Sequence, residues 1–484
     1  MNYKIVSYTV GRILQIEASL LLLPMLVSII YSGKDGPESI WAFLITAAIS
    51  LAAGLLLTYV FGKNNKLLFA REGFAIVALA WILMSAVGAL PFFISGEIPN
   101  YIDALFETVS GFTTTGASIL TDVEAMSHGM LFWRSFTHWL GGMGVLVFVM
   151  AILPQDTGRN IHIMRAEMPG PIVGKLMPRL SQTAKILYII YFAMTLAETV
   201  LLLFGGMSLF DSIVHSLGTA GTGGFGIKAN SIGGYNNYCQ WVITVFMLLF
   251  GVNFNLYYLM LLKQFKTALK STELWVYGII VVFAGIVITV NILPMYSGIA
   301  EAVRHAFFQV ASIITTTGYS TVDFNLWPGF SKAVLVVLMF VGGCAGSTAG
   351  GIKISRFIIA IKTVFRDIRK MLHPRSVSSV KFEGKTTDEK TINSVSIYFA
   401  FYIIIFLALF LIISIEPFDF ETNFTAVSAC FNNIGPGLSA VGPMESFAGY
   451  SDAATLLLTF AMLLGRLEIF PILLIFTPSM WKKK

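Results

Sequence analysis

Long apolar stretches dominate this chain and restrict it to folding in a lipid bilayer. A helix needs roughly 20 apolar residues to cross the hydrocarbon core. Of the 484 residues, 56% are hydrophobic and only 12% are charged, whereas soluble domains carry about 25% charged residues. The stretches are long and continuous instead of alternating, which disfavours a membrane β-barrel. We therefore predict an all-α membrane protein with about ten transmembrane helices, near residues 8–31, 39–60, 73–94, 130–152, 183–205, 240–262, 274–294, 330–366 (interrupted), 392–414 and 453–477.

Basic residues concentrate in the connections that lie on one side of these predicted spans. With the N-terminus in the cytoplasm, 26 of the 32 Lys and Arg residues fall in cytoplasmic segments. The positive-inside rule therefore predicts that both termini are cytoplasmic. The net charge of +6 reflects this distribution, so it gives no reason to expect nucleic acid as a partner. Three widely spaced cysteines (Cys239, Cys344 and Cys430) form no CxxC pair, so they suggest neither a disulfide framework nor a zinc site.

Four short polar runs interrupt the connections on the opposite side. Each follows an apolar stretch of about ten residues, which is too short to cross the membrane. Aligning the runs on Gly116, Gly224, Gly318 and Gly435 also superimposes residues 103–107 on 305–309. We therefore predict a fourfold pseudo-symmetric repeat of span, pore helix, filter strand and span, a potassium-channel-like arrangement. The predicted parts are a two-helix extension at 1–70 and pore repeats at 71–160, 161–265, 266–390 and 391–484.

Physical chemistry limits what such a repeat can be. Non-helical backbone at membrane depth survives only where it is buried in protein or lines a water-filled path. Four strands around one axis would direct rings of carbonyl oxygens inward, and such rings can replace the hydration shell of a cation. Alternatively, each loop could merely help helices to pack, since Gly, Ser and Thr are common at membrane helix interfaces. Four loops in register on one side favour the ion path.

Several motifs in a fixed order resemble a known family. They are the segment 71–74 after two extra N-terminal spans, the segment 165–171, the four polar runs, the glycine-rich segment 342–351 and the segment 465–468. Together they resemble the Trk/Ktr/HKT superfamily of potassium and sodium transporters, and most closely its bacterial TrkH and TrkG potassium uptake subunits. The resemblance implies that K⁺ is the transported ion and that the protein lies in the bacterial inner membrane. It also implies a homodimer with one pore per subunit, gated by a cytoplasmic TrkA-like ring that binds nucleotide.

The resemblance also assigns residues to a selectivity filter. A serine stands at the first filter-glycine position in relatives that pass mainly sodium, so the four glycines here favour potassium. The second and fourth strands depart from the Thr-Thr-Thr-Gly pattern, which predicts an asymmetric ring with modest discrimination against sodium. The implied potassium ligands are backbone oxygens of Thr113, Thr114 and Thr115, of Gly221, Thr222 and Gly223, of Thr315, Thr316 and Thr317, and of Asn432, Asn433 and Ile434, followed by the filter glycines Gly116, Gly224, Gly318 and Gly435.

The eighth predicted span contains five glycines among ten residues, a composition that disfavours regular helix. We expect it to unwind, and the resemblance implies that the unwound segment is the gate. Arg466 lies inside the last apolar run, where a charge costs at least ~2.5 kcal/mol, and the resemblance places it beside the gate. The alternatives are a small-residue packing face for the segment and snorkelling for the arginine. The implied gate consists of Gly342, Gly343, Cys344, Ala345, Gly346, Ser347, Thr348, Ala349, Gly350, Gly351 and Arg466.

Other signals are weaker. The run from Gly221 to Gly226 matches GxGxxG but lacks a flanking βαβ unit, so we expect no nucleotide site in this chain. His138, Glu17 and Glu198 are scattered and form no acid–base or metal constellation, which argues against an enzyme. The hypothesis is a gated channel-like potassium translocator. A proton- or sodium-coupled potassium symporter remains the alternative, and it would need acidic residues near the filter.

Overall fold

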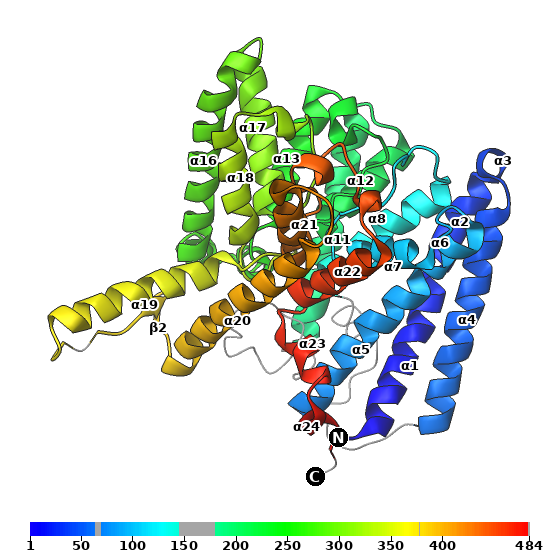
Figure 1. The fold of residues 1–484 in the computed structure, drawn as a ribbon, viewed down its shortest axis with the longest axis horizontal. Helices are drawn as coiled ribbons and strands as arrows, with labels where there is room; N and C mark the ends of the chain where they lie inside the picture. Colours follow the sequence, from blue (N-terminus) through cyan, green and yellow to red (C-terminus); the bar gives the residue numbers. More distant parts are fainter. Residues whose placement is uncertain (63–68, 145–179, 377, 483–484) are drawn as a thin grey trace.

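The computed structural model describes residues 1–62, 69–144, 180–376 and 378–482. Within these ranges the chain is mostly helical and its strands form one small hairpin, so the predicted all-α class is confirmed (Figure 1). The motif at 165–171 lies outside the described residues. The N-terminal extension consists of α1 (Tyr3–Leu20), α2 (Leu22–Ile30), α3 (Ser32–Asp35) and α4 (Glu38–Phe61). It covers one flank of the molecule, where α1 and α4 pack closely at Gly11 and Gly54.

Four short helices precede the polar runs, as the sequence predicts. They are α7 (Tyr101–Phe112), α12 (Leu209–Gly221), α17 (Ile299–Ile314) and α21 (Phe420–Asn432), each 12 to 16 residues long. Side chains of Asn100, Ser208 and Asp419 cap three of their N-termini by accepting backbone N–H groups. Polar caps therefore start these helices, and each helix is too short to cross a membrane.

Each short helix lies between two longer helical segments. The first segments are α5 (Ala70–Gly88) with α6 (Leu90–Ser95), α11 (Leu180–Phe204), α16 (Thr272–Ile292) and α20 (Glu389–Ile413). The second segments are α8 (His128–Gly142), α13 (Asn237–Phe250) with α14 (Phe254–Leu261), α18 (Gly329–Val341) with α19 (Ile354–Leu372), and α22 (Asp452–Arg466) with α23 (Phe470–Ile475). Helices α4, α11, α16 and α20 leave many large apolar side chains exposed, as lipid-facing helices do.

Six helical spans in the described residues are long and apolar enough to cross a membrane, and a seventh is the bent pair α13–α14. The predicted spans 240–262 and 453–477 are therefore not regular helices. The first bends by 89° between α13 and α14, and the second breaks after Arg466, where Glu468 and Ile469 have φ values of +52° and +68°. The span at 130–152 is described only to residue 144.

The predicted interruption of the eighth span is present. Helix α18 ends at Val341, and residues 342–353 form a loop before α19 begins. Helix α19 does not continue the direction of α18. Instead it projects sideways next to α20, and a two-stranded antiparallel hairpin of β1 (Lys381–Phe382) and β2 (Lys385–Thr386) connects the two (Figure 1). The remaining short elements are α15 (Phe265–Ala268), α24 (Pro478–Trp481) and the 3₁₀ turns η1 (Ser231–Gly234), η2 (Leu293–Met295), η3 (Phe324–Leu326), η4 (Ser439–Val441) and η5 (Phe447–Gly449).

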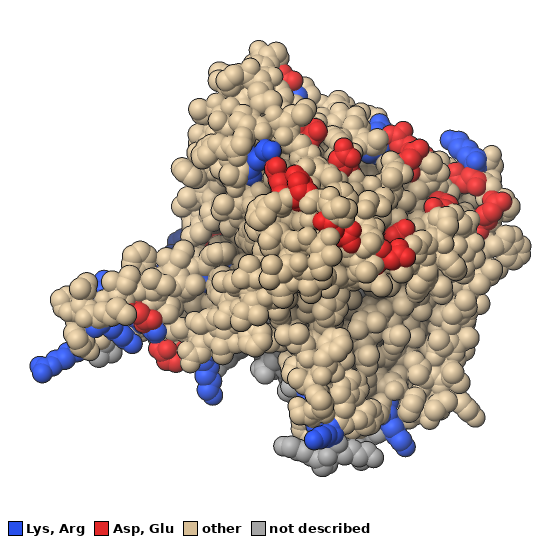
Figure 2. Space-filling view, in the orientation of Figure 1, with Lys and Arg blue, Asp and Glu red and all other residues tan. Residues whose placement is uncertain are grey.

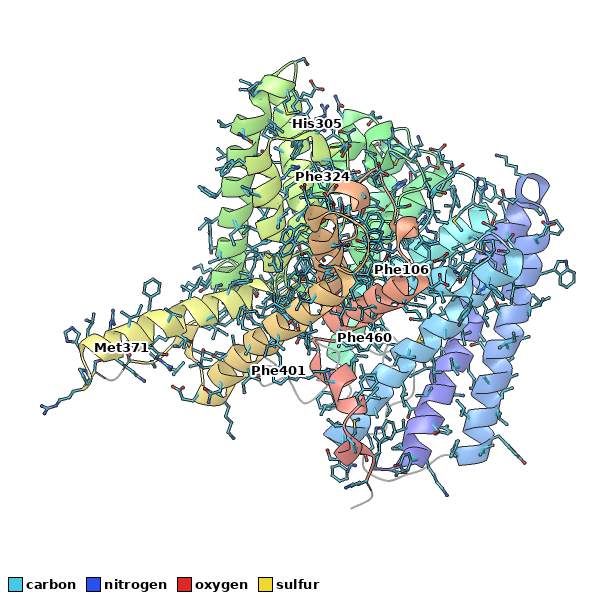
Figure 3. All side chains as sticks on the ribbon, in the orientation of Figure 1. Phe106, His305, Phe324, Met371, Phe401 and Phe460 are labelled. Carbon is cyan, nitrogen blue, oxygen red and sulfur yellow. The ribbon has the colours of Figure 1, made fainter. Side chains whose placement is uncertain are left out.

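Acidic and basic side chains predominate at opposite faces of the molecule. On the face visible in Figure 2, acidic side chains gather at the upper side, whereas basic side chains gather near the lower end and along the projecting arm of α19. Both termini lie at the lower end (Figure 1). The interior between these faces is apolar and aromatic. Phe106 and Phe324 are fully buried within it, while Met371 on α19 is exposed (Figure 3).

Candidate functional site

All four short helices end in the same hydrogen-bonded turn. In the first repeat, the N–H of Thr115 donates to the carbonyl of Ser110 at 2.8 Å and that of Thr114 donates to Gly111 at 3.1 Å. This is the Schellman pattern, whose penultimate residue adopts the left-handed conformation. The left-handed residues are Thr114 (φ +55°), Thr222 (+56°), Thr316 (+55°) and Asn433 (+57°), and the equivalent long bonds join Gly223 to Gly218, Thr317 to Ser312 and Ile434 to Ala429.

This geometry corrects part of the sequence prediction. A strand was predicted directly after each short helix, but the first residues of the polar runs continue the helix and then reverse its hand. The physical reason is that the last carbonyls of a helix need partners, and at membrane depth the turn itself supplies N–H donors. Left-handed backbone is uncommon for threonine, and such outliers cluster at functional sites. The same outlier in all four repeats marks these turns as a common functional element.

The glycines that follow the turns close the four repeats into a ring. Their φ values are +79°, +79°, +87° and +101°. A Cβ atom placed on Gly116 would lie 1.9 Å from the carbonyl oxygen of Gly223. Such a distance is a steric clash, so no side chain fits there without a backbone shift. The same relation joins Gly224 to Thr317 (1.9 Å), Gly318 to Ile434 (2.2 Å) and Gly435 to Thr115 (2.8 Å), which completes the circle.

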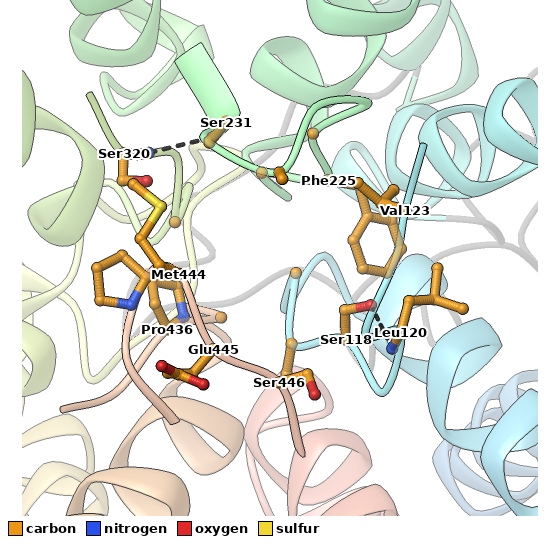
Figure 4. Close-up of a pocket in the computed structure, with 18 of the residues that line it drawn as sticks. Ser118, Leu120, Val123, Phe225, Ser231, Ser320, Pro436, Met444, Glu445 and Ser446 are labelled. Carbon is orange, nitrogen blue, oxygen red and sulfur yellow. Dashed lines mark hydrogen bonds between the residues drawn. The ribbon is translucent and has the colours of Figure 1, made fainter. Parts of the chain in front are cut away.

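On the side away from the termini, the ring opens into a cavity of about 230 Å³. All four glycines of the ring line it, together with loop residues from each repeat (Figure 4). Ser118, Ser231 and Ser320 contribute polar groups, and Glu445 lies at the rim beside Met444. The strands thus meet at one polar depression accessible from outside the protein.

On the other side of the ring, the glycine-rich loop packs directly against the strands. The Gly350 N–H donates to the Thr316 hydroxyl at 2.6 Å, and the Gly351 N–H donates to the Asn432 carbonyl at 3.1 Å. Lys353, which is 2% exposed, donates from Nζ to the Ala349 carbonyl. One of the twelve predicted ligand carbonyls, that of Asn432, is therefore occupied by the loop.

Arg466 lies between the loop and the first strand. Its guanidinium donates to the Thr348 carbonyl at 3.0 Å, to the Thr114 hydroxyl at 3.2 Å and to the Gly142 carbonyl at 2.8 Å, and it also contacts the Gly141 carbonyl. The last two carbonyls end α8, where helical carbonyls lack intrahelical partners and the helix dipole favours a cation. The side chain thus points into the protein and does not snorkel toward the membrane surface.

Polar side chains brace the strands from behind. The hydroxyls of Thr113 and Thr115 are 2.7 Å apart, and those of Thr315 and Thr317 are 2.8 Å apart. The Asn433 amide donates to the Thr115 hydroxyl at 2.9 Å and thereby joins the first and fourth strands. The Thr113–Thr115 and Thr315–Thr317 bonds thus lie within single strands, whereas the Asn433–Thr115 bond joins two strands.

A buried ion pair behind the first strand was not singled out in the sequence. Arg134 and Glu107 are 2.7 Å apart, and their side chains are 3% and 0% exposed. Glu107 also accepts the Ile119 N–H, while Arg134 reaches the Gly226 carbonyl at 3.2 Å and so connects two repeats. The only sequence signal was the alignment of Glu107 with a glutamine of the third repeat, because its partner lies 27 residues away on another helix.

His138, which the sequence placed in no acid–base or metal constellation, joins the same two repeats. His138 Nδ1 lies 2.8 Å from the Gly111 carbonyl, and its Nε2 accepts the Phe225 N–H at 3.2 Å. The buried carboxylates of Glu17 and Glu198 lie on α1 and α11, on neither the ring nor the loop. No group of three or more His, Cys, Asp or Glu side chains in the described part of the chain could hold a metal ion.

The fold and the ring together define an all-α membrane protein of the transporter class. Comparison with known proteins is specific. The family model for TrkH, described as cation transport protein, matches residues 39–483. The Trk system potassium uptake proteins TrkH and TrkG of Escherichia coli are 37% and 35% identical to this chain, covering 100% and 99% of both proteins. The crystal structure of the potassium transporter TrkH from Vibrio parahaemolyticus superimposes with a TM-score of 0.89 at 32% identity, over 100% of both chains. The chain belongs to the TrkH family.

The buried ion pair yields a stability prediction. Arg134→Ala leaves the Glu107 carboxylate buried without its partner, which typically costs 3–5 kcal/mol. We expect a clear fall in the apparent melting temperature of the detergent-purified protein. The matched control removes both charges by combining Glu107→Gln with Arg134→Met, and it should recover much of the loss. Equal melting temperatures for the single and double variants would contradict this account of the pair.

Proposed function

We propose that this protein conducts potassium across the bacterial inner membrane through a gated, channel-like pore and serves as a potassium uptake subunit. The observation that carries the proposal is the closed ring of four left-handed turns whose glycines line one cavity. Carbonyl rings of this kind can substitute for the hydration shell of K⁺. The names of the two Escherichia coli relatives, potassium uptake proteins, support the choice of ion.

The filter assignment follows the ring. The carbonyls of Thr115, Gly223, Thr317 and Ile434 each lie beside the glycine of a neighbouring repeat, so they form the best-defined layer of potential ligands. The other proposed ligands precede them in each turn. The Asn432 carbonyl, one of these ligands, also accepts the Gly351 N–H, which connects the filter to the proposed gate.

The gate is proposed to be the loop from Gly342 to Gly351 together with Arg466. The loop lies against the strands opposite the outer cavity, so an ion that left the ring would meet it next. A guanidinium fixed beside Thr114 adds a repulsive charge to that path. In low-dielectric surroundings, such a charge raises the barrier for a cation more strongly than it would in water.

The same proposal includes orientation and assembly. The basic lower end, which contains both termini, is assigned to the cytoplasm because basic connections favour that side. A homodimer and a TrkA-like nucleotide-binding ring are the proposed partners, on the strength of the family. The name Trk system borne by the curated relatives fits a multi-component transporter.

Uncoupled flux is the first expectation. Purified protein in liposomes should pass potassium or rubidium down its gradient with no gradient of any other ion, because a carbonyl ring needs no co-transported ion. The measurement is ⁸⁶Rb⁺ uptake with and without the cytoplasmic regulatory partner. A strict requirement for a proton or sodium gradient would instead support the symporter.

Selectivity should depend on the first filter glycine. In Gly116→Ser, the new side chain must displace the Gly223 carbonyl, so the preference for K⁺ over Na⁺ should fall by about tenfold, equivalent to ~1.4 kcal/mol of discrimination. The matched control is Gly226→Ser, where a Cβ atom meets its nearest neighbour at 3.4 Å. Unchanged selectivity in Gly116→Ser, measured as the ratio of potassium to sodium flux, would refute the filter assignment.

Basal flux should rise when the gate is weakened. Arg466→Ala removes the charge and the bond to Thr348, and deletion of residues 347–349 removes the loop tip. If either change lowers the barrier to the ion by ~1.4 kcal/mol, the basal flux rises about tenfold. Lys332→Ala serves as the control because its partly exposed ion pair with Glu421 lies on the α18–α21 contact. Wild-type flux in both gate variants, in the same liposome assay, would show that another element closes the pore.

A further inference from the structure

One buried carboxylate outside the pore holds both ends of the glycine-rich loop. Glu273 lies in the first turn of α16 and is 4% exposed. Its Oε1 accepts the N–H of Ala345 at 2.8 Å and the N–H of Ser355 at 3.0 Å. These two residues are ten positions apart in the chain and flank the loop tip. A single oxygen atom therefore closes the base of the loop.

The segment between these two anchor points makes the contacts with the ring. Thr348 accepts from Arg466, Gly350 donates to Thr316 and Gly351 donates to Asn432. Because the base and the tip belong to one short loop, releasing the base frees the tip to leave the strands.

A second carboxylate connects this base to the hairpin between α19 and α20. Glu383 Oε1 accepts the Ser271 hydroxyl and the Glu273 N–H, both at 3.0 Å. Glu383 occupies the tight turn between β1 and β2 with φ +49°. The neighbouring Phe382 is 5% exposed and packs in an apolar cluster that also contains Cys344 of the loop. The hairpin, the start of α16 and the loop thus form one hydrogen-bonded chain.

We propose that Glu273 is a positioning residue whose hydrogen bonds to Ala345 and Ser355, together called the clasp, hold the intramembrane loop against the strands. We further propose that the hairpin controls this clasp through Glu383. The inference deepens the proposed gate and rests on it. It assigns the regulatory input to the β1–β2 hairpin on the face proposed to be cytoplasmic. When the hairpin is displaced, the Glu383 carboxylate no longer accepts the Glu273 N–H at the start of α16. The bonds from Glu273 to Ala345 and Ser355 then weaken, and the loop moves away from the strands.

The test measures loop release separately from ion flux. Cys344 is 1% exposed, so a membrane-impermeant maleimide reaches it only when the loop opens. In a Cys239→Ser, Cys430→Ser background, Glu273→Ala should raise both the rate of Cys344 labelling and the basal ⁸⁶Rb⁺ flux about tenfold, the effect of losing the two backbone hydrogen bonds that Glu273 accepts. Potassium-to-sodium selectivity should stay at the wild-type value, since the ring is untouched.

Two conservative variants separate positioning from general stability. Glu273→Gln keeps an acceptor oxygen in place, so labelling and flux should remain within about threefold of wild type. Glu383→Ala should raise both readouts, by less than Glu273→Ala does, while Lys385→Ala on the exposed side of the same hairpin should match wild type. If Glu273→Ala fails to fold, labelling of Cys344 in Glu383→Ala decides the question.

The outcomes also separate this inference from the proposed function. Wild-type labelling and flux in Glu273→Ala and Glu383→Ala, together with raised flux in Arg466→Ala, would overturn the clasp and leave the gate intact. If no variant passes ⁸⁶Rb⁺, including the loop deletion, the proposed function fails. Faster Cys344 labelling in Glu273→Ala would then still establish the clasp as a structural device.

Discussion

The structure depends on one constraint: four stretches of backbone leave the helical conformation inside a membrane protein, and every exposed carbonyl and N–H group there needs a partner. Each repeat meets this requirement with the same Schellman turn, in which the bonds from residues such as Thr115 to Ser110 satisfy the end of the short helix. The residues after the turn are then held in place with carbonyls beside the glycine of the next repeat. The turn therefore creates both a helix end and one quarter of a ring.

The breaks in the second helices obey the same constraint. Helix α8 ends at Gly142, α13 at Phe250 and α22 at Arg466, all close to the starts of the strands. Ending a helix leaves carbonyls free, and at the end of α8 the guanidinium of Arg466 uses them. A buried charge and a set of unpaired carbonyls are each unfavourable alone. Together they are compatible, which explains how one arginine can end an apolar helix inside the fold and also contact the loop at Thr348.

Sequence reasoning recovered the parts of this arrangement that repeat or have an unusual composition. The four glycines, the short helices before them and the unwound segment after Val341 could be located because each leaves a local signature. The left-handed turns could not be predicted, because threonine in the sequence favours extended backbone and only the helix end imposes the turn. The bend between α13 and α14 was missed for a similar reason. Gly251 and Asn253 lie at the bend, but the stretch as a whole is apolar enough that hydropathy indicates a single span.

The amino-acid sequence alone determined that the chain is a membrane protein and that it contains four copies of one unit. It also located the glycine that follows the short helix in each copy. These properties follow from composition and from the spacing of residues that lie close together in the chain, so the sequence displays them directly. Only the tertiary structure decided how Gly116 meets Gly223 around the ring, how Arg134 pairs with Glu107, and how Glu273 holds both ends of the loop. Each of these contacts joins separate elements of the fold, so its partner is specified by packing and not by any pattern within a single segment.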